Sequence, residues 1–100
     1  MEAMTDSDDG SLFDRYLRDR DRRALTELFE RYAARLYALA VAVLRDGPAA
    51  EDAVQQVFLR LLEARRGPEP GHFRAWLYRI AHNETMQMLR SGKRRQQREQ

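Results

Sequence analysis

The chain lacks cysteine altogether. Disulfide bonds and thiolate metal sites are therefore excluded, and a reducing, cytoplasmic compartment is the expected setting. Long apolar runs are also missing, because the longest one, residues 36–44, spans nine residues, whereas a transmembrane helix needs about 20. We therefore expect no membrane insertion. The acidic N-terminus, with Asp6, Asp8 and Asp9, has the wrong charge for a signal peptide.

Signatures of catalysis and of metal binding are missing as well. The sequence has no glycine-rich phosphate loop, and its few serines lie in expected tails and helix caps. Its two histidines, His72 and His82, are ten residues apart, whereas paired metal ligands on a helix are usually three or four apart, so that both project from one face. We therefore predict that the protein is not an enzyme and uses no metal or other cofactor.

The apolar residues that are present follow a helical period. One hundred residues, 43% of them hydrophobic, suit one domain with one small core. No segment alternates with a period of two, so no strand is expected, and apolar residues recur at spacings of three and four. The predicted fold class is all-α, a compact bundle of three main helices plus a short N-terminal helix.

The chain divides into three segments by composition. Residues 1–10 are acidic and almost without apolar side chains, which predicts a flexible tail. Residues 11–92 form the helical domain, beginning with a short helix capped by Ser11. Residues 93–100 are basic and are expected to start a flexible linker, and Gly92 is expected to end the last helix or to let it fray.

The three main helices have recognisable start and stop signals. The first should run over about residues 22–45, with Asp21 as its cap. Gly47 suits the left-handed position after a helix and Pro48 the first turn of the next, which should end near residue 65. The stripe predicted to be buried on the first main helix consists of Leu25, Leu28, Phe29, Tyr32, Leu36, Leu39, Ala40 and Val43.

The second main helix carries a further stripe away from its expected core face. Its members, also three and four residues apart, are Asp52, Gln55, Gln56, Leu59 and Glu63. A leucine framed by polar groups is typical of a partner-facing helix. Single exposed leucines are also ordinary on a solvated face, and the residues alone favour this second interpretation.

The last helix, after a loop at residues 65–71 that holds two prolines and two glycines, is the basic part of the chain. Residues 72–100 carry seven Lys or Arg and only two acidic side chains. This excess of positive charge is typical of a segment that binds an acidic partner. It is equally typical of a solvated helix end whose bases complement the helix dipole, and charge alone does not decide between the two. Trp76 shares its register with buried positions, which favours core packing over stacking on nucleic-acid bases.

Several segments, taken in order, resemble conserved region 2 of bacterial sigma-70 family factors. They are residues 52–60 (DAVQQVFLR) and residues 73–83 (FRAWLYRIAHN), followed by a basic run. Upstream, residues 28–32 and 36–40 resemble the first part of the same region. The resemblance is closest to the extracytoplasmic-function group, and it covers about residues 12–95.

The resemblance implies that the domain docks on the RNA polymerase core, recognises the promoter −10 element and helps to melt DNA. The polymerase contacts implied, on the clamp helices of the largest subunit, are Asp52, Gln55, Gln56, Leu59 and Glu63. The implied contacts to DNA, principally to the −10 non-template strand, are Arg65, Arg66, Arg79, His82, Asn83, Gln87, Arg90, Lys93 and Arg94. An anti-sigma factor is a further expected partner.

Departures from the family pattern leave an alternative open. Gln56 stands where the family usually has an acid, and the sequence ends at Gln100, before the helix-turn-helix domain that full members carry. We interpret this end as one domain of a longer protein. The alternative function is a sigma-like interaction module that binds an anti-sigma factor or polymerase without sequence-specific DNA recognition.

Overall fold

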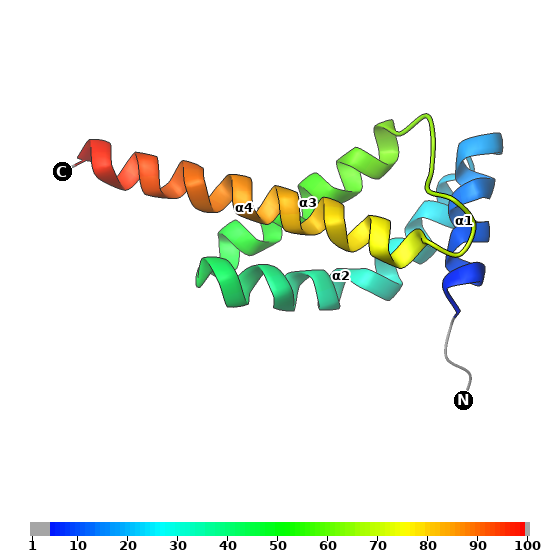
Figure 1. Ribbon diagram of the computed structural model, residues 1–100, viewed down its shortest axis with the longest axis horizontal. Helices are drawn as coiled ribbons and strands as arrows, with labels where there is room; N and C mark the ends of the chain where they lie inside the picture. The colour runs from blue at the N-terminus through cyan, green and yellow to red at the C-terminus, as the bar shows by residue number, and fades with distance from the viewer. Residues whose placement is uncertain (1–4, 100) are drawn as a thin grey trace.

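The computed structural model describes the backbone of residues 5–99 and the side chains as far as Gly92. Within residues 5–99 the chain is helical and contains no strand (Figure 1). The helices are α1 (Asp6–Asp19), α2 (Arg22–Leu44), α3 (Gly47–Glu63) and α4 (Phe73–Glu99). The prediction of an all-α fold with three main helices and a shorter N-terminal one is confirmed.

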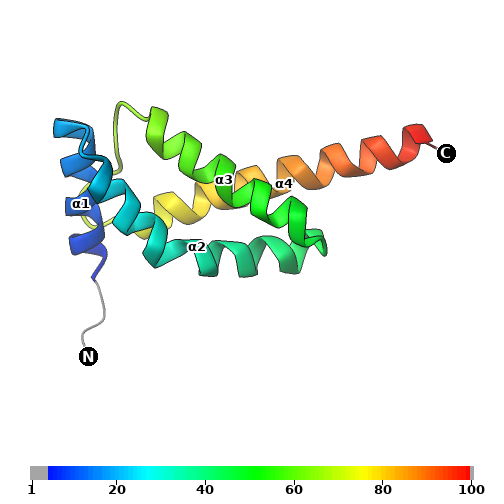
Figure 2. The same cartoon turned by 180° about the vertical axis from the view of Figure 1, so that it is seen from behind.

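The three long helices pack on one another, and α1 closes one end of them. Helix α2 packs against each of the other three helices. Helix α4 lies across the α2–α3 pair and projects beyond it, whereas α1 stands beside the start of α4 and the α3–α4 loop, residues 64–72 (Figures 1 and 2). The loop and the projecting part of α4 therefore lie toward opposite ends of the domain.

The N-cap of helix α1 lies six residues before the predicted cap at Ser11. Thr5 is its N-cap and forms a capping box with Asp8, in which each side chain accepts a hydrogen bond from the other residue's backbone N–H. Residues 6–10, predicted to belong to a flexible tail, are therefore helical. Residues 1–4 of that predicted tail lie outside the described part of the chain.

The α2–α3 junction corrects the role predicted for Gly47. The left-handed residue that ends α2 is Arg45, with φ 53°, and Gly47 is already the first residue of α3. The reason is Asp46, which must be extended to cap α3 and accepts a hydrogen bond from the Ala49 N–H at 3.2 Å. Pro48 lies in the first turn of α3, as predicted.

The structure also tests the predicted start of α2 and the predicted end of α4. Asp21 caps α2 as predicted, accepting a hydrogen bond from the Arg23 N–H at 3.0 Å. The last helix does not end at Gly92, which was one of the two outcomes expected there, because α4 continues to Glu99.

The core is shared by all four helices. Its largest fully buried apolar side chains are Tyr32, Phe13, Phe73, Leu28, Leu36, Leu61, Leu77 and Val57. On α2 the predicted stripe is wider than the buried face, because Phe29, Leu39 and Val43 are 43%, 51% and 43% exposed. None of the helices in the described chain has the combination of length and apolar composition that a membrane crossing requires.

Trp76 packs against the core, as its register predicts. Its ring centroid lies 5.2 Å from that of Phe13 and 6.0 Å from that of Phe73, and the side chain is half-buried. Aromatic pairs at these separations add to the stability that burial provides. The indole is therefore part of the packing that fixes the start of α4.

Candidate functional site

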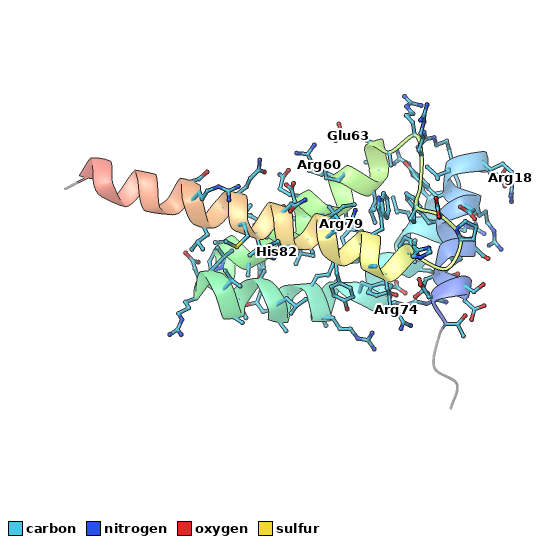
Figure 3. The ribbon with its side chains drawn as sticks, in the orientation of Figure 1. Arg18, Arg60, Glu63, Arg74, Arg79 and His82 are labelled. Atoms are coloured by element: carbon cyan, nitrogen blue, oxygen red, sulfur yellow. The ribbon has the colours of Figure 1, made fainter. Side chains whose placement is uncertain are left out.

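The predicted second stripe of α3 is exposed along its whole length. Asp52, Gln55, Gln56, Leu59 and Glu63 all reach solvent, while the opposite side of the helix is buried. Leu59 is 45% exposed. Figure 3 shows Glu63 and its neighbour Arg60 near the C-terminal end of this helix.

An apolar groove lies next to this stripe, between α2 and α3. It has a volume of about 410 Å³, and the residues that line it are Arg22, Leu25, Thr26, Phe29, Gln55, Phe58, Leu59 and Leu62. The Phe29 ring packs edge-on against Phe58, with 4.8 Å between ring centroids. Because Phe29 and Leu59 are both nearly half exposed, the groove presents two large apolar side chains to solvent.

Only some of the residues predicted to face polymerase line this groove. Gln55 and Leu59 line it. Gln56 instead lines a polar hollow of about 500 Å³ between α3 and α4, which we call the α3–α4 hollow. Asp52 and Glu63 are exposed but line neither of these two depressions. Gln56 is thereby brought next to residues predicted to bind DNA, Gln87 and Arg90.

The polar residues of α4 form a continuous exposed face. Arg79, His82, Asn83, Gln87 and Arg90 are all exposed, and Figure 3 shows Arg79 and His82 on the first half of the helix. All except Arg79 also line one shallow hollow of about 530 Å³. The side chains of Lys93 and Arg94, the remaining predicted DNA contacts on this helix, lie outside the described residues.

The two loop arginines stand apart from this face. Arg65 and Arg66 are exposed in the loop next to α1, whereas the other described residues predicted to bind DNA belong to α4. The loop ends in a turn in which the His72 N–H donates to the Glu69 carbonyl at 3.1 Å. The predicted DNA-binding residues therefore form two groups, one on the loop and one along α4.

An ion pair that the sequence analysis missed joins α3 to α4. Arg60 Nε lies 3.4 Å from Glu84 Oε2, and the Glu84 side chain is only 12% exposed. Both residues line the α3–α4 hollow. Because a pair with an exposed partner contributes at most about 1 kcal/mol, its main effect is to orient the two side chains. No sequence pattern pairs residues on two different helices in this way.

A partly buried polar cluster at the junction of α1, α2 and α4 was also missed. Its members, which we call the junction cluster, are Asp6, Asp9, Arg31, Tyr32 and Arg74. Asp9 is 1% exposed, pairs with Arg31 Nη1 at 2.6 Å and accepts a hydrogen bond from the Tyr32 hydroxyl. The spacing of Asp9 with Leu12 and Phe13 is a helical signal, but its acidic neighbours favoured a tail.

Because of its place in the junction cluster, we expect Tyr32 to ionise at a higher pH than an ordinary tyrosine. Burial, and then the hydrogen bond to Asp9, raise the pKa of Tyr32 to about 12. A raised pKa means that the folded chain favours the neutral phenol of Tyr32 over the ionised form. The contribution of this neutral phenol to folding stability is therefore complete below the ordinary tyrosine pKa of about 10 and is lost as the pH rises toward 12. A tyrosinate absorbance titration should contain a step near pH 12 that Tyr32→Phe removes. Persistence of that step in Tyr32→Phe would contradict the assignment.

The described side chains contain no group of three or more His, Cys, Asp or Glu residues placed to hold a metal ion. The described surface carries instead an apolar groove and a cationic helix face that bears amide side chains. Exposed apolar patches are typical of protein-interaction sites, and arginine and amide side chains are typical of contacts to phosphates and bases.

The model of the family Sigma-70 region 2 matches residues 28–95. The chain therefore belongs to the sigma-70 region 2 family, and its relatives place it with the extracytoplasmic-function group, which confirms the resemblance seen in the sequence. No solved structure matches the chain significantly.

Three curated relatives illustrate the similarity. RNA polymerase sigma factor CarQ of Myxococcus xanthus is 38% identical over 74 residues, which is 73% of this chain and 42% of that protein. ECF RNA polymerase sigma factor SigK of Mycobacterium sp. (strain KMS) is 31% identical over 87 residues, 85% of this chain and 45% of that protein. ECF RNA polymerase sigma factor SigE of Mycolicibacterium smegmatis is 36% identical over 64 residues, 64% of this chain and 25% of that protein. The chain thus spans less than half the length of these relatives.

Proposed function

We propose that this domain docks on core RNA polymerase through the α2–α3 groove and captures the −10 element of promoter DNA during transcription initiation. The observation that carries the proposal is the separation of two unlike surfaces on one small domain of this family. One is an apolar groove with Leu59 and Phe29 exposed. The other is the exposed α4 face with its arginines and amides.

The groove suits a helical protein partner. Large exposed apolar side chains in a depression, bordered by polar groups, are typical of interface centres. Leu59 would anchor the clamp helices of the largest polymerase subunit, with Gln55 beside it in the groove. Asp52, Gln56 and Glu63 would form the polar rim of the same contact, since they are exposed on the same helix.

The α4 face and the loop suit single-stranded DNA. Arginines supply attraction to phosphates that does not depend on sequence and weakens with salt. Asn83 and Gln87 carry amides that donate and accept at once, so they can distinguish base edges. Extruding a base costs a few kcal/mol, which contacts to polymerase and to the captured non-template strand would offset without a nucleotide cofactor. The loop, residues 64–72, would hold the extruded base, and its Arg65 and Arg66 would contact the phosphates of that strand.

The test separates base reading from phosphate attraction in complexes of the chain with bacterial core RNA polymerase. A randomised pool of single-stranded DNA is selected on these complexes, and the most enriched sequence is compared with its scrambled permutation. Asn83→Ala should lower the affinity for the enriched sequence by about 5- to 150-fold, the loss expected for one base contact, and leave the scrambled strand unaffected. Arg90→Ala is the matched control on the same helix face. It should weaken both strands alike and reduce the salt slope by about 1.

Two outcomes would contradict this assignment. Equal losses for both strands in Asn83→Ala would remove Asn83 from base recognition. Failure of the unsubstituted chain to enrich any sequence, with polymerase binding intact, would favour the alternative of an interaction module. In that alternative the groove serves polymerase or an anti-sigma factor, and the domain does not read DNA.

A further inference from the structure

Helix α1 holds the end of α3 that leads into the loop. The Tyr16 hydroxyl donates a hydrogen bond to the Leu62 carbonyl at 2.5 Å, in the last turn of α3. The Arg20 guanidinium reaches the same carbonyl at 3.5 Å. The last carbonyls of a helix have no intrahelical partner, so α1 supplies the missing donors at the point where the loop begins.

The same helix caps the start of α4, where the loop ends. Asp6 Oδ1 accepts a hydrogen bond from the backbone N–H of Arg74 at 2.9 Å, in the first turn of α4 (Figure 3 labels Arg74). First-turn N–H groups also lack an intrahelical partner, and a carboxylate is favourable at the positive end of the helix dipole. A residue 68 positions upstream thus acts as a cap for α4.

Asp9 fixes the placement of α1 itself. It is buried, and its carboxylate is held by Arg31 and Tyr32 of α2. Tyr32 Oη in turn accepts a hydrogen bond from Arg74 Nε at 3.1 Å. The junction cluster therefore ties α1, α2 and the first turn of α4 into one unit, and breaking it leaves a buried charge without its partners.

The loop lies directly on α1. A methyl group at Gly67 would come within 3.2 Å of both the Phe13 ring and Leu17 Cδ1, so the backbone passes close over these side chains. Loop residues 68–71 and the side of α1 near Ser11 and Asp14 enclose a hollow of only about 80 Å³. The inner side of the loop therefore rests on α1, while Arg65 and Arg66 remain exposed.

We propose that α1 is the positioning element of the DNA-reading loop, with Asp6 and Asp9 as positioning residues. This inference rests on the proposed function of the loop. Neither carboxylate contacts DNA. They set the separation and orientation of the loop ends, and so preorganise the loop for base capture. Preorganisation raises the affinity for the matching strand because less ordering remains to be done on binding, whereas phosphate attraction does not require it.

The test uses Asp6→Ala, which removes the cap on α4, in complexes with bacterial core RNA polymerase. The enriched and scrambled single strands described above are the probes. Asp6→Ala should lower the affinity ratio of enriched to scrambled strand by about threefold or more, which is the order expected from loss of a helix cap. Affinity for the scrambled strand and for polymerase should stay unchanged. In hydrogen exchange, the amides of residues 65–74 should lose protection.

Two further variants keep the result interpretable. Asp19→Ala removes the same charge from the exposed C-terminal end of α1 and should leave the affinity ratio unchanged. Tyr16→Phe removes only the hydroxyl that holds Leu62 and should lower the ratio in the same direction, which covers the case in which Asp6→Ala does not fold.

The outcomes distinguish the positioning role from the proposed function. An unchanged ratio in both Asp6→Ala and Tyr16→Phe, with faster exchange in the loop, would make α1 a structural support only and overturn the inference. Absence of any enriched sequence for the unsubstituted chain would instead overturn the proposed function, and the positioning role with it. A loss of polymerase binding in Asp6→Ala would likewise count against a role confined to the loop.

Discussion

Leu59→Arg is expected to raise the dissociation constant of the chain for the isolated clamp helices of RNA polymerase by about 100-fold or more. Leu59 is one of the two large exposed apolar side chains of the α2–α3 groove, next to Phe29. Buried apolar anchors at interface centres typically contribute 2 kcal/mol or more, and a charge placed among apolar groups adds a desolvation cost. Together these effects reach about 2.7 kcal/mol, which is 100-fold in affinity.

The matched control is Leu39→Arg. Leu39 is 51% exposed on α2 but does not line the groove, so the same chemical change is made on an equally exposed leucine elsewhere. Its dissociation constant should stay within about twofold, because surface substitutions away from an interface change little. Isothermal titration calorimetry measures both. Equal effects of the two substitutions would remove the groove as the docking surface.

Phe13→Ala is expected to lower the free energy of unfolding by about 3–5 kcal/mol, the range for truncating a buried aromatic side chain. Phe13 is 1% exposed, and its ring packs against Tyr16, Phe73 and Trp76 with centroids 6.1, 5.6 and 5.2 Å away. Its loss would leave a cavity where α1 meets the start of α4.

Urea denaturation followed by circular dichroism measures this loss, and Phe29→Ala provides the comparison. Phe29 is 43% exposed and contacts Phe58 at the groove, so its truncation should cost less than half as much, since far less apolar area leaves the interior. If Phe13→Ala lowers the free energy of unfolding by less than about 1 kcal/mol, the loss falls well below the usual range for such truncations. This result would mean that α1 contributes little to the core.

The sequence predicted the main helices well because each has a strong local signal. Asp21 caps α2 and Pro48 starts α3 as expected, since capping and proline geometry depend only on neighbouring residues. The register of Trp76 also placed its ring correctly against the core. Such features depend on residues only a few positions apart, so the helical spacing of apolar residues and the capping residues suffice to predict them.

What the sequence did not predict depends on contacts between distant segments. The burial of Asp9 requires Arg31 and Tyr32, more than 20 positions downstream, so its acidic neighbours were interpreted as a tail. Phe29 has the period of a core residue, and only the packing of α2 against α3 leaves it exposed in the groove. Likewise, the Arg60–Glu84 pair joins two helices in a way that no local pattern encodes.

We propose that one domain uses the groove for polymerase and the α4 face for DNA. Photocrosslinking tests it most directly, with a benzoylphenylalanine placed at Leu59 in one variant and at Asn83 in another. Both are assembled with core polymerase and the enriched single strand. Position 59 should crosslink to the largest polymerase subunit and position 83 to the DNA strand. Crosslinks from both positions to polymerase alone, or from position 59 to DNA, would contradict it.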